Sequence, residues 1–266
     1  MLEIFQYDFM LRAFAAGLII GILAPIIGLF LVVKRYSLLA DTLSHVSLVG
    51  VALGVLLGFN PVAGALGISI LAAFGIERLR ENKKIFGESV LALFLSGSLA
   101  IAVVILGFTN GLGVNIFSYL FGSITTVTTG DLQIIGTFGL IVIILTAWLF
   151  KRFFLISYDE ELAKANGLRV EWLNITLMIL AAITVALAMR IVGILLVGAL
   201  MVIPVLSALQ FGKSFKITSR LAVIFSLIGV LAGLFSSFYL NLPSGGAIVV
   251  CCLIIFVISL LINKNS

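Results

Sequence analysis

The sequence lacks most of the charge that a soluble protein carries on its surface. Charged residues make up 10% of the chain and hydrophobic residues 62%, whereas a typical soluble domain is about 25% charged. So little charge, together with apolar runs of membrane-spanning length, excludes a soluble globular domain and indicates an integral membrane protein. The runs are too long for barrel strands, so we expect an all-α fold.

Several chemical signatures are also missing. The sequence contains neither the Gly-x-x-x-x-Gly-Lys-Ser/Thr loop of nucleotide-binding proteins nor the His-Glu-x-x-His of zinc proteases. One histidine cannot build the usual catalytic zinc set, which disfavours an intramembrane metalloenzyme. We therefore expect no enzyme activity and no catalytic residues in this chain. If ATP drives its function, another chain must hydrolyse the ATP.

Cysteine and basic residues exclude further classes. Cys251 and Cys252 are adjacent in an apolar run, where they indicate small core or lipid-facing side chains and not a disulfide framework or a metal site. The net charge of +5 comes from short basic clusters between apolar runs, so no nucleic-acid partner is expected.

The apolar runs divide the chain into about nine transmembrane helices within a single transmembrane domain, residues 1–266. A span needs about 20 residues, and the runs that meet this need cover roughly 10–33, 40–59, 61–76, 88–108, 131–150, 172–189, 191–210, 221–240 and 243–262. Arg190 and Gly193 separate the sixth run from the seventh, because the apolar stretch there is too long for one crossing.

Basic residues predict the orientation of these spans. Cytoplasmic loops are rich in Lys and Arg, and clusters of them follow the odd-numbered spans: Lys34, Arg35, Arg78, Arg80, Lys83, Lys84, Lys151, Arg152, Lys164, Arg169, Lys213, Lys216, Arg220 and Lys264. Only Arg12 and Arg190 fall on the other side. We therefore expect the N-terminus outside and the C-terminus in the cytoplasm. The first four spans then start outside and the last four inside, as an inverted repeat of 4+4 helices would produce.

The single histidine, His45, lies four residues after Asp41 at the start of the second span. Residues at i and i+4 share one face of a helix. This pair can ligate a divalent transition metal or relay a proton; alternatively, Asp41 is simply a helix N-cap in front of a satisfied histidine. Ionisable groups in a span are expensive, which favours a functional role.

The surroundings of the pair sharpen this hypothesis. Ser37, Thr42, Ser44 and Ser47 make the start of the span polar, as a water-lined path would require. Two ligands are too few for a tight structural zinc site, but a transport site must release its ion. Two chains meeting across a two-fold axis would bring two such pairs together. Span counting puts Asp41 near the cytoplasmic face, whereas transport sites usually lie near the bilayer midplane. Either a polar segment dips into the membrane before the second span, or the pair works at an inner gate.

Residues 34–54 resemble the signature of the zinc/manganese-type ABC importer permeases, in which a basic pair and a Ser precede an Asp-x-Leu-Ser/Ala-His core followed by Gly-Val-Ala-x-Gly. Residues 119–124, 192–204 and 242–245 resemble the Tyr-Leu-Phe-Gly element, the seventh span and the last external turn of that family. The resemblance covers nearly the whole chain in the right order.

The resemblance implies a permease homodimer in the bacterial cell (inner) membrane that imports Zn²⁺ or Mn²⁺, with zinc favoured. Its implied partners are a cytoplasmic ABC ATPase dimer and an extracytoplasmic metal-binding protein, and the metal is cargo, not a permanently bound cofactor. Asp41 and His45 match the family positions of pathway ligands. Glu88 stands where the family tends to have a carboxylate; alternatively, it is a first-turn Glu that interacts with the helix dipole.

A second candidate lies in the cytoplasmic loop of about 151–171. Acidic residues, a later Lys and an Asn-Gly end predict a short helix here. This helix is either a solvated connector or, as the resemblance implies, the element that docks on the ATPase. The predicted coupling residues are Glu160, Glu161, Ala163, Ala165 and Gly167.

Two questions stay open on sequence alone. A self-contained proton-coupled metal carrier would also use Asp41 and His45, as a relay, and would need no ATPase. The hydroxyl-rich segment from Tyr119 to Thr129 is either an ordinary interfacial helix or a re-entrant segment that lines a cavity, and Asp131 behind it is most simply an N-cap.

Overall fold

The computed structural model describes residues 3–81, 86–108 and 116–263, and no strand occurs within these ranges. The α-helices are α1 (Asp8–Val33), α2 (Leu38–Leu57), α3 (Pro61–Glu81), α4 (Gly87–Phe108), α5 (Ile116–Phe121), α6 (Thr129–Tyr158), α7 (Glu160–Ala165), α8 (Val170–Ala188), α9 (Val197–Leu209), α10 (Phe215–Leu240) and α11 (Ser244–Asn263), with short 3-10 turns η1 (Glu3–Gln6) and η2 (Ile124–Thr126). The all-α prediction is confirmed. Three orientation charges, Lys83, Lys84 and Lys264, lie outside the described residues.

Eight of the described helices are long and apolar enough to span a membrane, and they match the predicted spans except the seventh. In its place, α9 has only 13 residues, about 20 Å at 1.5 Å per residue. That is shorter than the roughly 30 Å hydrocarbon core of a bilayer. A full seventh helix was therefore a wrong prediction: residues 190–196 form turns, and Gly193 has a φ of 84°.

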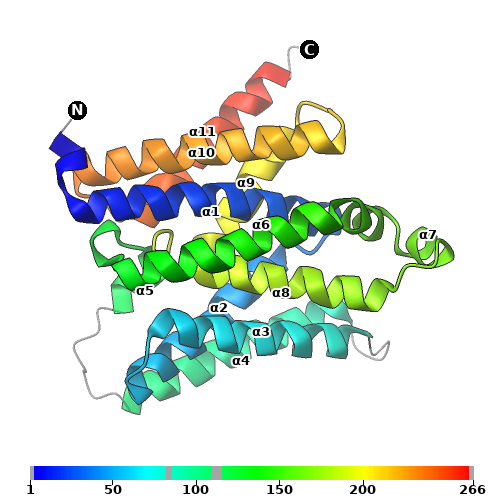
Figure 1. The fold of residues 1–266 in the computed structure, drawn as a ribbon, viewed down its shortest axis with the longest axis horizontal. Helices are drawn as coiled ribbons and strands as arrows, with labels where there is room; N and C mark the ends of the chain where they lie inside the picture. Colours follow the sequence, from blue (N-terminus) through cyan, green and yellow to red (C-terminus); the bar gives the residue numbers. More distant parts are fainter. Residues whose placement is uncertain (1–2, 82–85, 109–115, 264–266) are drawn as a thin grey trace.

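The described basic clusters gather at one end of the bundle. Phe30 near the end of α1 packs on Phe153 of α6 and on Phe215 at the start of α10, with ring centroids 5.7 and 5.4 Å apart. Lys34 and Arg80, which end α1 and α3, both approach Glu160 of α7. We call this the basic end; it lies with α7 at the right of Figure 1, away from the N-terminus.

Residues 190–212 still pass from one end of the bundle to the other. Residues 190–196 lie beside α5 and the start of α11, at what we call the opposite end, and α9 runs from there toward Lys213 at the basic end. The seventh crossing is thus half loop and half helix. This preserves the alternation of the spans and the one-sided placement of the basic clusters.

The burial of the helices separates an interior from a periphery. Of the most apolar window in each helix, 72% of residues are buried in α2 and 67% in α8, but only 22% in α4 and 28% in α6. In Figure 1, α2 and α9 lie behind the layer formed by α1, α6 and α8. The helix that carries Asp41 and His45 is therefore enclosed by protein, whereas α4 and α6 leave many apolar side chains exposed on the surface of the chain.

Residues 191–194 of the loop inside the seventh crossing are buried, so their backbone polar groups need partners. The amides of Ile194 and Leu195 donate to the carbonyls of Tyr119 and Leu120 at 2.9 and 3.2 Å. The hydroxyl of Ser244, the first residue of α11, donates to the carbonyl of Ile191 at 2.6 Å. Three segments that resemble family motifs, far apart in sequence, therefore meet at one point.

This meeting point leaves no room for a side chain at Gly193. A Cβ there would stand 2.5 Å from the Leu120 carbonyl oxygen, in a backbone conformation that L-residues rarely adopt. We expect Gly193→Ala to lower the free energy of unfolding by more than about 1 kcal/mol, measured as a lower melting temperature in detergent.

Gly136→Ala on α6 is the matched control, because no atom lies within 4 Å of a Cβ at that position. It should be neutral or stabilise the helix by up to about 1 kcal/mol. Equal melting temperatures for the two variants would contradict the packing described for Gly193.

Candidate functional site

Asp41 and His45 lie on one face of α2, and this face is its accessible one. Between residues 39 and 52 of α2 these two side chains are half-buried and all others are buried. Val49, 8% exposed, and the half-buried Leu53 continue the same stripe at intervals of four residues. The accessible surface of this part of α2 is therefore a single stripe that begins with Asp41 and His45, the predicted ligand pair.

Asp41 is not a helix cap, so the alternative reading of it as one is wrong. Helix α2 begins at Leu38 after the turn at Tyr36 and Ser37, which makes Asp41 its fourth residue. Its carboxylate lies directly against Gly198 in the first turn of α9, where a Cβ would overlap Oδ1. The N-terminus of a helix carries partial positive charge and favours a carboxylate.

His45 has a ring nitrogen to spare. Its Nδ1 is buried and has no hydrogen-bond partner among the described residues. Buried polar atoms are rarely left unpaired, and such an exception asks for an explanation. An imidazole nitrogen without a partner, on the same helix face as a carboxylate, is a candidate for half of a metal site.

The position of the pair along the bundle follows from its contact with α9. Gly198 lies eleven residues before the end of α9 at Leu209, about 17 Å along the helix axis. Half of a hydrocarbon core is about 15 Å. The contact therefore lies at the end of α9 that is remote from Leu209, and the depth of the pair in the membrane stays a prediction.

Three of the four hydroxyl-bearing residues predicted to line a water-filled path are buried, and Ser37, at the N-cap of α2, is half-buried. Thr42, Ser44 and Ser47 are 0–1% exposed. Ser44 donates to the carbonyl of Asp41 at 2.7 Å, and Ser47 donates to that of Ser44 at 2.6 Å. The helical period turns these residues away from the face of Asp41 and His45, so their hydroxyls are satisfied within α2. The predicted polar path was wrong in this respect.

Glu88 is separate from the pair. It lies exposed in the first turn of α4 and lines a cavity of about 360 Å³ at the basic end, together with Arg35, Tyr36 and Arg80. Within the described part of the chain, no three His, Cys, Asp or Glu side chains converge as a metal site. One chain therefore offers two clustered ligands, Asp41 and His45, and a metal role for Glu88 stays a prediction.

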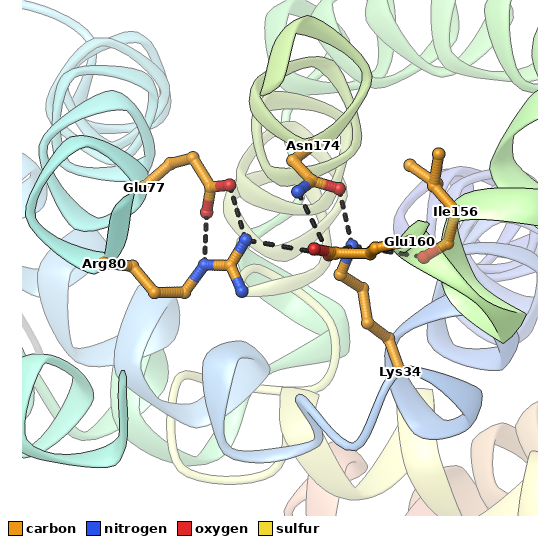
Figure 2. A network of polar contacts seen from close by, with 6 residues as sticks. All are labelled: Lys34, Glu77, Arg80, Ile156, Glu160 and Asn174. Atoms are coloured by element: carbon orange, nitrogen blue, oxygen red, sulfur yellow. Dashed lines mark hydrogen bonds and ion pairs between the residues drawn. The ribbon is translucent and has the colours of Figure 1, made fainter. Parts of the chain in front are cut away.

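A polar network fills the basic end just before α2 (Figure 2). The Lys34 ammonium, whose side chain is 6% exposed, lies 2.6 Å from Oε1 of Glu160. It also donates to Oδ1 of Asn174 at 2.5 Å and to the carbonyl of Ile156 at 3.5 Å. One buried cation thus connects the end of α1 to α6, α7 and α8.

Arg80 and Glu77 of α3 extend this network. Arg80 donates from Nε to Oε2 of Glu77 at 2.7 Å and from Nη2 to Oε1 of the same carboxylate at 2.6 Å. The same guanidinium lies 3.9 Å from Glu160 and stacks 4.7 Å over the ring of Tyr36. Burial raises the pKa of Glu160, but the hydrogen bond and charge of Lys34 outweigh it and bring that pKa below its ordinary value. Glu160 is therefore ionised at neutral pH and loses its charge only as the pH falls through this lowered pKa.

The short helix predicted for the loop of about 151–171 has the expected form. Asp159 caps α7 by accepting from the amide of Leu162 at 2.9 Å, and the chain leaves the helix through Asn166 and Gly167, which has a φ of 75°. The five predicted coupling residues do not share one surface. Ala163 is fully buried against its own chain and Glu160 is held by Lys34, so the exposed members are Glu161, Ala165 and Gly167.

A buried ion pair holds the opposite end. Arg190 lies 3.2 Å from Oδ2 of Asp131, with side chains 11% and 0% exposed, and its guanidinium lies 4.7 Å from the ring of Tyr119. Thr128, not Asp131, is the N-cap of α6, and its hydroxyl accepts from the amide of Asp131. The Asp131 carboxylate in turn accepts from the amide of Thr128, which completes a capping box. The arginine that broke the charge pattern is thus neutralised inside the protein.

Sequence reasoning missed the partners of these buried charges. Lys34 was interpreted as an orientation charge and as part of the basic pair of the family signature, and Arg80 as an orientation charge. Neither Glu77 nor Asn174 was singled out. The available signal was the type of residue in an apolar context: the carboxylate of Glu77 at the end of the third span and the amide of Asn174 within the sixth. In the structure both side chains are buried. Such groups need a partner wherever they occur in a span.

Comparisons with known proteins agree with the resemblance read from the sequence. Residues 6–263 match the model of the ABC 3 transport family. A probable metal transport system membrane protein from Treponema pallidum is 36% identical over 96% of this chain and 96% of the relative. The manganese transport system membrane protein MntC of Listeria monocytogenes is 31% identical, over 96% and 91%.

A zinc protein and a solved structure are also similar. The high-affinity zinc uptake system membrane protein ZnuB of Haemophilus influenzae is 28% identical over 96% of this chain and 98% of the relative. The structure described as PsaBC from Streptococcus pneumoniae in complex with Fab superposes with a TM-score of 0.86 at 30% identity, over 97% of this chain and 92% of the other.

The buried pair at the opposite end yields a stability prediction. Asp131→Ala leaves the Arg190 guanidinium buried without its partner, which should cost about 3–5 kcal/mol. We expect a clear fall in melting temperature in detergent. The double variant Asp131→Leu/Arg190→Met removes both charges and should melt above Asp131→Ala. A double variant that melts below the single one would contradict the description of the pair as two charges that compensate each other.

Proposed function

The chain belongs to the ABC 3 transport family, and we propose that it is the subunit through which Zn²⁺ or Mn²⁺ enters the cell. Family and relatives support a metal permease subunit of ABC type in a bacterial membrane. The finer proposal concerns the route of the ion, the ligands that pass it on and the partners that drive it.

The observation that carries this proposal is the accessible stripe of α2. Helices enclosed by protein are normally buried all round, yet Asp41 and His45 are the two side chains of residues 39–52 that stay accessible. Each is prepared for an ion: the carboxylate by the first turn of α9, and the imidazole by its unpartnered Nδ1. An ion that moves along this stripe meets a nitrogen and a carboxylate donor together.

Two ligands from one chain suit an ion in transit. A structural zinc site normally has four ligands, and a half-filled site would hold the metal too weakly to store it. We propose that a second copy of the chain supplies the other Asp41 and His45 across a two-fold axis. The pairs would then form a transient site of two nitrogen and two carboxylate ligands.

The donor types fit the metals named for the relatives. Imidazole suits zinc, carboxylate suits manganese, and raw affinity does not decide selection in cells. The relatives include a manganese and a zinc transport protein. We therefore propose the class of divalent transition metals, within which zinc stays a prediction.

The proposed partners fit the two ends of the bundle. A cytoplasmic ABC ATPase dimer would bind the exposed side of α7 at the basic end, where Glu161 and Ala165 are accessible. An extracytoplasmic metal-binding protein would dock at the opposite end. The alternative function, a self-contained proton-coupled carrier, would need no ATPase. Membership of an ABC transport family favours a permease driven by an ATPase over that carrier.

The ligand pair can be tested in proteoliposomes that contain the permease, its ATPase and its binding protein. We expect Asp41→Ala and His45→Ala each to reduce uptake of Zn²⁺ and Mn²⁺ by at least about tenfold, as losses of metal-site groups do, while the complex still assembles. Asp8→Asn removes an exposed carboxylate at the opposite end of α1 and is the control. Uptake at the unaltered rate in the two site variants would refute their role as ligands.

Gly198 gives a test that leaves both ligands in place. A Cβ at this position would overlap the Asp41 carboxylate, so Gly198→Ala must displace the carboxylate from the first turn of α9. We expect uptake to fall about tenfold or more, because misplaced site groups lose rate steeply. Gly136→Ala, with open space around its Cβ, should transport normally. Normal uptake by Gly198→Ala would show that the contact with α9 does not matter for transport.

A further inference from the structure

The contacts of α7 reach beyond its neighbours in sequence. As a helix of six residues between α6 and α8, it touches both. Its long-range partners are Lys34 and Arg80, which approach Oε1 of Glu160 to 2.6 and 3.9 Å. The proposed ATPase-binding helix is thus attached by charge to the ends of α1 and α3, as Figure 2 shows.

Lys34 is well suited to hold α7 in one place. An ammonium has three donors, and Lys34 directs them to Glu160, Asn174 and the carbonyl of Ile156. Asn174 completes the arrangement by donating from Nδ2 to the same Glu160 oxygen at 3.2 Å. A shift of α7 that carried Glu160 away would break this set and leave a buried cation unpaired, at a steep cost.

Lys34 also lies close to the metal-ligand pair along the chain. It caps the end of α1, and residues 35–37 complete the turn before α2, whose fourth residue is Asp41. Arg35 in this turn has a φ of 63°. The ring of Tyr36 lies 5.6 Å from Lys34 and 4.7 Å from Arg80. Lys34 and Arg80, the two cations that contact Glu160, therefore also contact Tyr36 in the turn that precedes α2.

We propose that the Lys34–Glu160 ion pair, supported by Arg80 and Tyr36, transmits movement of α7 to the start of α2 and so to Asp41 and His45. Lys34 and Glu160 are positioning residues for transport: they touch neither the metal nor, in the case of the buried Lys34, the ATPase. This inference rests on the proposed function, since it assumes that an ATPase moves α7.

The first test measures metal uptake and ATP hydrolysis together in proteoliposomes that contain the full complex. In Lys34→Gln and Glu160→Gln we expect basal ATP hydrolysis to continue while metal imported per ATP falls at least about fivefold, as for a lost coupling between sites. The double variant should lose no more than either single one, because both substitutions break the same contact. Lys213→Gln and Lys216→Gln remove exposed charges at the same end, outside the loop of residues 151–171, and should keep the ratio.

Lys34 separates transmission from direct docking. If Glu160 acted only by binding the ATPase, Lys34→Gln would keep the transport ratio, because its side chain is 6% exposed; that result would overturn the proposal. A fall in uptake that merely follows a smaller amount of assembled complex would overturn it as well. No ATP-driven uptake of either metal by the unaltered complex would instead refute the proposed function.

A second measurement reports on α2 itself. Val49 continues the stripe of Asp41 and His45 and is 8% exposed, so a thiol there reads the accessibility of that face. In a chain with Val49→Cys, Cys251→Ser and Cys252→Ser, we expect ATP to change the rate of thiol labelling. Adding Lys34→Gln should abolish this change, and a change of unaltered size would overturn the proposal.

Discussion

The fold depends on one constraint: in a chain this apolar, every polar group inside the membrane must find its partner within the protein. Regular helices meet this demand locally, and the eight long helices do so along their length. The demand is hardest at residues 191–194, where the backbone is irregular and the residues are buried. There, carbonyls of α5 and the hydroxyl of Ser244 supply the partners, and the Asp131–Arg190 pair compensates the charge.

The same constraint explains why the site lies where it does. Because residues 190–196 take up part of the seventh crossing, α9 starts inside the protein and not at its edge. Its first turn then meets α2 beside Asp41. A continuous seventh helix would present side chains and satisfied amides at this depth. The broken one presents a helix N-terminus, which favours a carboxylate and leaves it accessible on one side.

Much of this arrangement could be predicted from sequence, and the reasons for the rest are physical. Hydropathy predicted the long helices, and the positions of Lys and Arg between them predicted that these charges gather at one end. The i, i+4 spacing placed Asp41 and His45 on one helix face. The faces of Thr42, Ser44 and Ser47 were misjudged because the sequence does not show which side of α2 is packed. The partners of Lys34 lie 126 and 140 residues away, at Glu160 and Asn174, and no local pattern reveals contacts of that kind.

The contact between Asp41 and Gly198 links two positions of the chain in evolution. A residue with a Cβ at position 198 and a carboxylate at position 41 compete for the same space, so a lineage that gained the first would have to shorten or lose the second. Relatives that keep Asp here should also keep glycine there, although the two residues belong to different motifs. A homologue with a larger residue at position 198 would therefore have moved this carboxylate, which we propose as a ligand, away from the first turn of α9.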